Sequence, residues 1–422
     1  MKTFLFGIRK QKSPSQSANV SDTLTLKPGQ CNLTAYVAAI KRIPLQNRKE
    51  NCRGVPLTAA ALQPFWTRYV PTLGLGISKK IFPDDYSAIL TCAYYLISEG
   101  QALSRAEKWS RQALTPYGAV LADQRISELL VRITPALAQD FFSAWIEYNR
   151  GDKYYCMDIT SVSSYSELNE FVSYGYNRDR ETLPQVNLLM VSGHTSHLPL
   201  FFRTMPGSIH DVSTMDESLK RLDLVDARRL HMVMDKGFYS EENVDAMFRR
   251  HMRFLAGIPF TTSLSLDAVE RHRNDEMISY RHYCCVLGDE LYADTEQMKW
   301  KGHRCYLHVY FDSLKAALDE KRFSHRILTE YEELCSGNTV KGNQKDYERF
   351  FTVKETPKRG RKVEYNQEAI EAYRKNSVGW FVLATNDIKD PVEALEIYRM
   401  KDTVEKHFDD LKNDLDMKRL RI

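Results

Sequence analysis

The stretch KYYCMDIT, residues 153–160, marks the point where the sequence changes from helical to strand-forming patterns. Two further strands are predicted after it, PQVNLLMVS at 184–192 and LPLFFRTM at 198–205, and the polar turn GHTSH separates them. Three consecutive strands joined by polar connections indicate a meander.

Helices and strands alternate after the meander. A helix is predicted at STMDESLKRLDLV (213–225), a strand at LHMVMD (230–235), a helix opened by Ser240 (240–251) and a strand at MRFLAGIPF (252–260). The order of three strands followed by alternation predicts an α/β protein whose mixed sheet has helices packed on it.

The sequence pattern divides the chain into five regions. Residues 1–30 form a Ser- and Lys-rich leader, and 31–152 predict an α-helical N-terminal domain. Residues 153–259 form the first part of the strand-rich core. Residues 260–375 break the alternation with short strands, a charged helix and a basic loop, which indicates an inserted domain. Residues 376–422 return to the core with the strand GWFVLATN and a long final helix.

Charge is distributed unevenly along the chain. Residues 1–150 carry 19 Lys and Arg against 10 Asp and Glu, and the remainder carries 40 against 45. This asymmetry suits a nucleic-acid-binding region ahead of a carboxylate site, although many solvated helical domains are also basic. The helices of 31–152 can form a helix-turn-helix module or a plain bundle. We expect this region to bind DNA ends.

The composition argues against several other classes of protein. No apolar stretch reaches the length of about 18 residues that a membrane span requires. The apolar run near the N-terminus is too short for a signal peptide, which predicts a cytoplasmic protein. The eight cysteines form no CxxC pair and are expected to be reduced. Cys305 and His308 have a spacing seen in zinc sites, but no second pair accompanies them.

Two predicted strands end in an acid, Asp158 in YYCMDIT and Asp235 in HMVMDKGFYS. A carboxylate at the rim of a buried strand is costly unless it binds something, and strand ends are where α/β sheets place their sites. The alternative is that both are surface aspartates at ordinary strand-to-loop junctions. Finding two such acids together favours a functional site.

The last predicted helix carries a third acid. With its residues placed at about 100° each, the apolar side chains form a buried face. A stripe beside that face is formed by Tyr398, Lys401, Glu405 and Lys412. Glu405 is therefore expected at the edge of the core, in line with a phenol and two ammonium groups. The alternative is a solvated face on which Lys401 and Glu405 form an ordinary i, i+4 pair.

Three carboxylates at the edge of a mixed sheet suit a divalent metal site. Mg²⁺ takes oxygen ligands and commonly binds carboxylates together with substrate phosphates. Two such ions roughly 3.5–4 Å apart can assist a phosphoryl transfer that needs no protein nucleophile. The motifs GxSxG, HExxH and GxxxxGKS are absent, so a serine hydrolase, a zincin and a P-loop enzyme lack support.

These segments together resemble the DDE transposases of bacterial insertion sequences. The matching pieces are DITSVSSYS, GYNRDRETLPQVNLLM, MPGSIHDVSTM, MDKGFYSEENV and GWFVLATND with the final helix. The resemblance implies a ribonuclease-H-like mixed sheet with helices, interrupted by a mostly β insertion domain and preceded by the α-helical domain. In such a fold Asp158 and Asp235 would lie on neighbouring strands, and Glu405 would come from the helix.

The most specific part of the resemblance is the final helix. The family's signature is a Tyr, a basic residue three positions later, a Glu four after that and a Lys seven after the Glu; here these are Tyr398, Lys401, Glu405 and Lys412. The family usually has Arg where this chain has Lys401, and also directly after the second Asp, where this chain has Lys236. A lysine keeps the charge but loses the bidentate geometry of arginine. The resemblance implies that four basic or phenolic side chains contact DNA. They are Tyr398, Lys401, Lys412 and Lys236.

The resemblance further implies a metal-dependent DNA transposase. Asp158, Asp235 and Glu405 would be both the catalytic and the metal-binding residues and would hold two Mg²⁺ ions, with Mn²⁺ as a substitute. The expected reaction is cleavage at transposon ends followed by strand transfer of the 3′-hydroxyl into target DNA. The expected partners are double-stranded DNA, both as terminal inverted repeats and as target, and a second copy of the chain in a synaptic homodimer.

Several alternatives stay open. Relatives usually continue with another helical segment where this chain stops at Ile422. The chain can therefore be a truncated or repurposed descendant that binds DNA without catalysing transposition, or a nuclease without strand transfer. Asp211 lies in a turn before a predicted helix and is interpreted as structural. The basic run KRGRK at 358–362 can enter a DNA groove or form a solvated loop.

Overall fold

A computed structural model of the chain forms two compact units, Met1–His231 with Met400–Ile422, and Met232–Arg399. The expected leader, the helix predicted at 213–225 and Asp211 lie outside the described residues. The structure describes residues 76–99, 102–167, 169–179, 181–209, 231–273, 277–356, 360–415 and 417–420.

The described part of the N-terminal region is helical, as predicted. Thr134 caps its last helix by accepting a hydrogen bond from the N–H of Leu137, and Pro135 takes the first helical position, where the missing N–H costs nothing. No helix in the described ranges is long and apolar enough to cross a membrane. The helices are α3 (Gly76–Ile81), α4 (Tyr86–Glu99), η3 (Leu103–Arg105), α5 (Ala106–Ser110), α6 (Asp123–Arg132) and α7 (Pro135–Tyr148).

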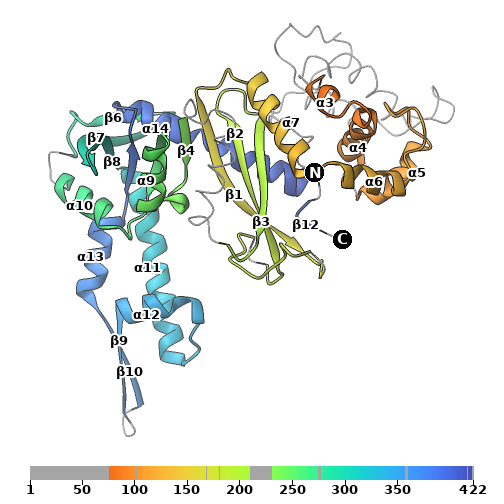
Figure 1. Cartoon of the computed structure of the whole chain (residues 1–422). Coiled ribbons are helices and arrows are strands. Elements are labelled where there is room, and N and C mark those ends of the chain that lie inside the picture. Colours follow the sequence, from red (N-terminus) through yellow and green to blue (C-terminus); the bar gives the residue numbers. More distant parts are fainter. Residues whose placement is uncertain are drawn as a thin grey trace, which may run out of the picture. The chain divides into compact units, whose positions relative to one another are not determined.

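Helix α7 packs directly on the sheet of the first unit (Figure 1). The ring of Phe142 lies edge-on against Phe201, with centroids 4.9 Å apart. The indole of Trp145 donates a hydrogen bond to the carbonyl of Pro199 at 3.0 Å. Both partners belong to β3 (Pro199–Pro206). The helical region therefore joins the sheet through its last helix.

The sheet of the first unit has the order β3-β2-β1, with β1 at Tyr154–Ser164 and β2 at Gln185–Gly193. Neighbouring strands are antiparallel, which confirms the predicted meander. A further strand, β12 (Arg419–Leu420), pairs in parallel with the end of β1. Two residues are too few to show a strand pattern, so the sequence analysis did not predict β12.

Strand β1 is longer than predicted, and Asp158 lies inside it rather than at its end. The expectation that this acid ends a strand is therefore wrong. The polar residues after it resemble a loop in sequence, but they are buried because distant groups bond to their hydroxyls. Ser161 Oγ accepts a hydrogen bond from the N–H of Arg178 at 2.9 Å, and Ser163 Oγ accepts one from Asn177 Nδ2 at 3.1 Å.

The strands of the second unit follow the order β4-β5-β11-β8-β7-β6. The predicted helix between the first two is α9 (Glu241–Arg249), and Ser240 caps it as expected by accepting a hydrogen bond from the N–H of Asn243. Strand β11 pairs antiparallel with both β5 and β8, so strands of the insertion continue the sheet. The strands are β4 (His231–Met234), β5 (Arg253–Ile258), β6 (Tyr283–Val286), β7 (Asp289–Trp300), β8 (His303–Phe311) and β11 (Trp380–Thr385).

The insertion is β-rich only in its first half. Residues 283–311 form the hairpins β6–β8, as the expectation of a mostly β domain requires, whereas 313–377 is mainly helical. The physical reason is the long α11, whose apolar stripe requires its own partners. The other elements of the insertion are α10 (Ser263–His272), α11 (Ser313–Ser336), η7 (Lys341–Asn343), α12 (Gln344–Phe350), β9 (Phe351–Thr356), β10 (Gly360–Tyr365) and α13 (Gln367–Ser377).

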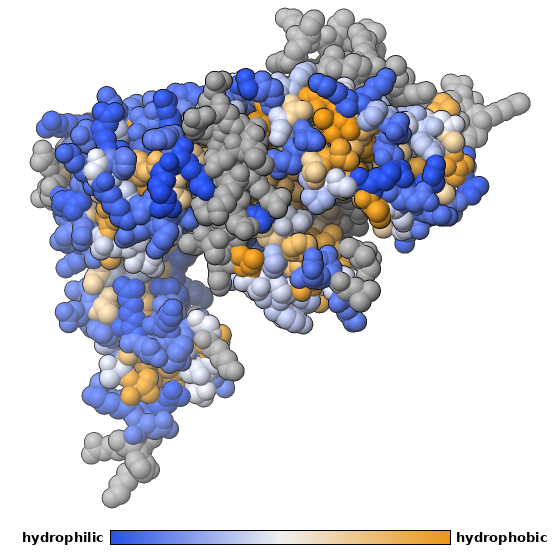
Figure 2. Space-filling model, in the orientation of Figure 1, coloured by the Kyte–Doolittle hydropathy of each residue, from blue (hydrophilic) through white to orange (hydrophobic). Residues whose placement is uncertain are grey.

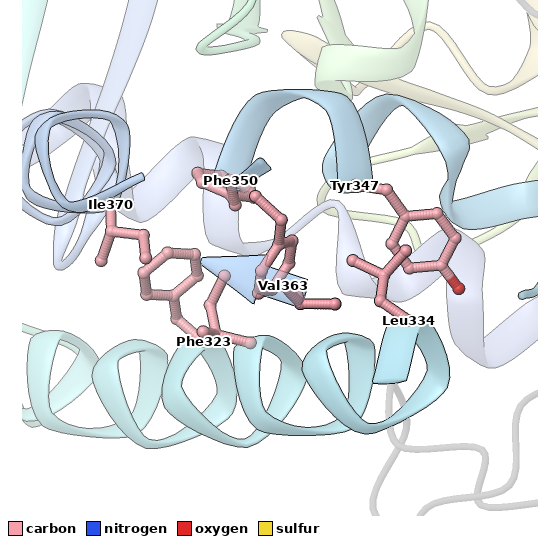
Figure 3. Packing of buried hydrophobic residues seen from close by; sticks show 8 residues of the cluster. Phe323, Leu334, Tyr347, Phe350, Val363 and Ile370 are labelled. Atoms are coloured by element: carbon pink, nitrogen blue, oxygen red, sulfur yellow. The ribbon is translucent and has the colours of Figure 1, made fainter. Parts of the chain in front are cut away.

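The helical half of the insertion has a core of its own. Figure 3 shows these side chains interlocking above α11, and the visible face of the same region is largely hydrophilic (Figure 2). A two-stranded hairpin such as β9–β10 is marginal alone, so this packing stabilises it. The core consists of Phe323, Ile327, Leu334, Tyr347, Phe350, Phe351, Val363 and Ile370.

The predicted single helix at the C-terminal end is interrupted, which corrects the sequence analysis. Helices α14 (Pro391–Arg399) and α15 (Asp402–Asp409) are separated by a turn, and a short π-helix, η8 (Asp410–Asp414), follows. In the turn, the N–H of Thr403 bonds to the carbonyl of Met400, a three-residue spacing. Each irregularity changes the rotation per residue, so a stripe drawn at a constant 100° does not continue through it.

Candidate active site

Asp158 lies in the middle of β1, with its side chain 18% exposed. Its Oδ1 accepts a hydrogen bond from the N–H of Ile159 at 2.7 Å, and the guanidinium of Arg178 lies 3.4 Å from the same oxygen. Arg178 also donates to the carbonyl of Ile159. The first predicted catalytic acid is therefore on a rigid strand with a fixed cation beside it.

The cation belongs to the 177–181 loop, by which we mean the described residues Asn177, Arg178, Asp179 and Glu181 between β1 and β2. Two acids of this loop bind basic residues from the segment after Glu405. Asp179 accepts from the Lys412 ammonium at 2.7 Å, and Glu181 accepts from Arg419 at 2.8 Å. The hydrogen bond from Arg419 lowers the pKa of Glu181. The loop thus connects the strand of Asp158 to the segment that follows Glu405.

Lys412 is buried, with its side chain 10% exposed. Glu405, by contrast, has a side chain that is 58% exposed. The two residues therefore do not share one stripe, because the π-helix between them has turned Lys412 toward the 177–181 loop. A contact between Lys412 and DNA stays a prediction, and it requires the ammonium to leave Asp179 or to serve both partners.

Glu405 projects from α15 next to a lysine. The ammonium of Lys401 lies 3.1 Å from Glu405 Oε1, and the lysine side chain is itself 18% exposed. This is the i, i+4 pair that the sequence analysis kept as an alternative. The carboxylate is nevertheless open to solvent on its other side, so the pair and a ligand role are compatible.

Asp235 directly follows β4, as predicted, and belongs to the second unit. The hydroxyl of Tyr398 donates a hydrogen bond to its Oδ1 at 2.8 Å. Gly257 on β5 makes room for this contact, because a Cβ there would lie 2.6 Å from the Tyr398 oxygen. Lys236, the next residue after the acid, is exposed. Sequence analysis identified Tyr398 but not the glycine that accommodates it.

The Cys305–His308 spacing does not mark a zinc site. Both ring nitrogens of His308 have partners, Thr295 Oγ1 at 2.7 Å and the carbonyl of Ile388 at 3.2 Å. Burial lowers the pKa of His308 to about 4 and raises that of Cys305 to about 12. These two residues are therefore an uncharged part of the core.

The three predicted metal ligands are divided between the units, with Asp158 and Glu405 in the first and Asp235 in the second. Across the described ranges no group of three or more His, Cys, Asp or Glu side chains lies close enough together to hold a metal ion. Each acid offers carboxylate oxygens only, which is the donor chemistry that a hard divalent cation takes. Shared coordination by all three stays a prediction.

Residues 149–422 match the family model of the transposase DDE domain. The chain belongs to the DDE transposase family. Among solved structures, it is similar to the cryo-EM structure of a piggyBac transposase synaptic complex with hairpin DNA, with a TM-score of 0.38 and 8% identity over 90% of this chain and 71% of that chain. No curated protein matches the sequence. The identification rests on the family match and not on the structural likeness.

The match places this DDE transposase in the fold class that the sequence predicted, a ribonuclease-H-like α/β fold with a mixed sheet. It covers Asp158, Asp235 and Glu405. Transposases of this family generally use divalent metal ions, in agreement with the oxygen-only donors of the three acids.

The partners of these acids were not predicted from the sequence. Arg178 and Asp179 stand in the segment GYNRDRETLPQVNLLM, which was quoted only for its likeness to the family. One signal was available, since Arg178 and Asp179 put opposite charges next to each other just before a buried strand. That signal did not indicate which distant residues Arg178 and Asp179 would contact.

Proposed function

We propose that this transposase cleaves DNA at the ends of a mobile element and transfers the freed 3′-hydroxyl into target DNA. Asp158, Asp235 and Glu405 are proposed as the catalytic residues and as ligands of two divalent ions, Mg²⁺ or its substitute Mn²⁺. The observation that carries the proposal is the hydrogen bond from Tyr398 to Asp235, 163 positions apart in the chain. It joins a residue of the signature helix to the second acid, which chance placement of two surface residues does not explain.

Each acid has a neighbour that can hold its carboxylate in one orientation. Tyr398 donates to Oδ1 of Asp235, and Lys401 donates to Oε1 of Glu405. When bound, the divalent ions would supply charge neutralisation at the scissile phosphate and activation of the attacking oxygen. The exposed Lys236 adds a positive charge next to Asp235, where it can attract a DNA phosphate.

The proposed partners are the terminal inverted repeats of the element, target DNA and a second copy of the chain in the synaptic complex. Lys236, Lys401, Lys412 and Tyr398 are proposed to contact phosphates. Such contacts carry no base sequence information. We therefore assign recognition of the ends to the N-terminal helical region. We further propose that the protein acts on DNA in the cytoplasm.

The test uses purified protein and a duplex copied from the DNA flanking its own gene, with the 3′ end of the element labelled. We expect nicking at the end of the repeat in Mg²⁺ or Mn²⁺ and none in EDTA. Addition of a plasmid should then give joined products. Asp235→Asn should abolish both reactions, because the amide keeps the shape of the side chain but is a poor cation ligand.

Asp267→Asn is the matched control, since this acid is exposed on α10 of the same unit. Nicking by Asp235→Asn at the wild-type rate would remove the proposed site. Salt-sensitive binding to the duplex with no cleavage in either metal would instead indicate a descendant that only binds DNA. Nicking without joined products would indicate a nuclease.

A further inference from the structure

The helix that carries Glu405 is attached to the sheet by polar contacts as well as by apolar packing. Thr403 and His407 stand two positions before and after Glu405 on α15, and both are buried. His407 Nδ1 lies 2.9 Å from Ser192 Oγ, and its Nε2 lies 3.0 Å from the carbonyl oxygen of His197. Both ring nitrogens of His407 are therefore engaged with β2 and the turn after it.

These contacts fix how His407 is oriented. A carbonyl oxygen only accepts, so Nε2 must be the donor, and in the neutral ring Nδ1 then accepts from the Ser192 hydroxyl. One proton arrangement satisfies both bonds. Hydrogen bonds are directional, whereas the burial of Val404 and Phe408 on the same face is driven by the hydrophobic effect, which has no preferred direction. The polar contacts thus specify the rotation of α15 about its axis.

The turn that receives α15 is itself rigid. Asp152 is buried, and its carboxylate accepts hydrogen bonds from the N–H groups of Thr195 and Ser196. Gly193 permits this approach, because a Cβ there would lie 2.1 Å from Asp152 Oδ2. His197 has a φ of 53°, a left-handed conformation that a non-glycine residue rarely adopts unless its surroundings hold it.

A second bond joins the turn to the helix. His197 Nδ1 lies 3.0 Å from Thr403 Oγ1, so His197 contacts α15 through both its ring and its carbonyl. Thr403 and His407 are four positions apart and therefore lie on one face of the helix. Glu405 is two positions from each, which at about 100° per residue places it on the opposite side. Its 58% exposure agrees with that placement.

We propose that His407, together with Ser192 and His197, is a positioning unit for Glu405. By fixing the rotation of α15, it determines the direction in which the Glu405 carboxylate points. A metal ligand must be held within about 0.5 Å of its working position, and the directional contacts of His407 can hold this eight-residue helix in one rotation. The inference rests on the proposed function, in which Glu405 binds a divalent ion.

The test compares His407→Leu, which keeps apolar bulk, with His407→Gln, whose amide can still donate to the His197 carbonyl. The first measurement is the affinity of the full chain for Mn²⁺. Electron paramagnetic resonance monitors it through the loss of the signal of free Mn²⁺, at a temperature well below the melting temperature. We expect His407→Leu to weaken Mn²⁺ binding about tenfold, as loss of supporting groups around metal ligands does. His407→Gln should recover most of that loss.

Hydrogen exchange of the α15 amides is the second measurement, and it should be faster in His407→Leu. Lys406→Gln, an exposed neighbour on the same helix, is the control and should change neither readout. If His407→Leu does not fold, Ser192→Ala removes one of the two bonds and takes its place. A destabilised protein with wild-type Mn²⁺ affinity would overturn the proposal, since a purely structural residue gives that result.

Glu405→Gln, measured in parallel, separates this inference from the proposed function. If Glu405→Gln weakens Mn²⁺ binding and His407→Leu does not, the positioning role is wrong and the metal site remains. If Glu405→Gln binds Mn²⁺ as the wild type does, the proposed metal site itself is wrong, and the positioning role is lost with it.

Discussion

Lys412, in the unit that carries Asp158 and Glu405, is buried and forms an ion pair of 2.7 Å with Asp179. Glu330, on α11 of the insertion, is more deeply buried, yet neither of its carboxylate oxygens accepts a hydrogen bond. The guanidinium of Arg326 faces this carboxyl group only at a distance, with its Nε 3.9 Å from Glu330 Oε1. The two regions thus bury charge in different ways, one with a close partner and one without.

The electrostatic consequences differ accordingly. Burial, and then the nearby charge of Asp346, raise the pKa of Glu330 to about 7. Arg326 pairs instead with Asp346, whose Oδ2 lies 3.1 Å from the guanidinium, and the guanidinium also lies 5.3 Å from the ring of Phe323. A buried charge is costly unless it is paired. The insertion has close ion pairs as well, such as Arg326 with Asp346 at 3.1 Å. The comparison therefore concerns the two buried residues: Lys412 has a close counter-ion, whereas the surroundings of Glu330 favour its neutral form.

The largest effect on activity is expected at Asp158, in the unit that also contains Lys412. Asp158→Asn should reduce nicking of the end duplex on the order of 1000-fold, about 4 kcal/mol in the activation barrier, because a metal ligand becomes a neutral amide. The measurement is the single-turnover nicking rate in Mg²⁺. Asp140→Asn, an exposed acid on α7, is the control. An Asp158→Asn protein that nicks at the control's rate would show that pairing in this region serves the fold alone.

Removal of one partner of the buried ion pair should have the next largest effect. Lys412→Ala leaves Asp179 without its cation and should lower the free energy of unfolding by about 3 kcal/mol. The double variant with Asp179→Asn should recover part of that loss, because the uncompensated charge is gone. Urea denaturation measures both. Equal destabilisation of the single and double variants would mean that the pair contributes packing rather than charge.

The same pair tests the predicted DNA contact of Lys412. Asp179→Asn releases the lysine from its partner, so end DNA should bind more tightly. The slope of the logarithm of the binding constant against the logarithm of the salt concentration should then become more negative by about 1, as expected for one further phosphate contact. Binding titrations at several salt concentrations measure this. An unchanged affinity and slope would assign Lys412 to the fold only.

The buried carboxyl group of Glu330 predicts that the stability of the fold depends on pH. A carboxyl group whose pKa is raised in the folded state stabilises the fold below its ordinary pKa, and that stability is lost as pH rises toward about 7. The loss for Glu330 should be about 2–3 kcal/mol. Glu330→Gln should remove this dependence and be more stable than the wild type at pH 8. Denaturation from pH 4.5 to 8 measures it, with the exposed Glu332→Gln on the same helix as control. A pH profile of Glu330→Gln that coincides with the wild type would contradict the raised pKa.

The smallest effect is expected at Arg178, which is 31% exposed and 3.4 Å from Asp158. Arg178→Gln should cost about 1 kcal/mol without metal, since a partly exposed ion pair contributes little. With saturating Mn²⁺ the difference should shrink, because the ion replaces the missing positive charge. Thermal melts with and without Mn²⁺ measure this. An equal cost in both conditions would show that Arg178 supports the backbone of β1 and not the charge of Asp158.

Much of the fold could be predicted because the signals are local. The apolar run of β2, the cap of α9 at Ser240 and the acid directly after β4 all depend on a few neighbouring residues. The family likeness of the final helix also lies in fixed spacings along the chain. These features therefore stand in the sequence whatever the remainder of the chain does.

Other features depend on groups far apart in the chain. Strand β1 continues past Asp158 because it pairs with β2 as far as Ser163 and the 177–181 loop bonds to its serines. Lys412 forms its ion pair with Asp179, which lies 233 positions earlier in the chain. His407 is engaged by Ser192, 215 positions away. Sequence alone determined which residues are candidates for the chemistry and the periods of the elements that hold them. The tertiary structure decided the partner of each residue, because hydrogen bonds and ion pairs act over a few ångströms of space, and only the folded chain brings such distant positions together.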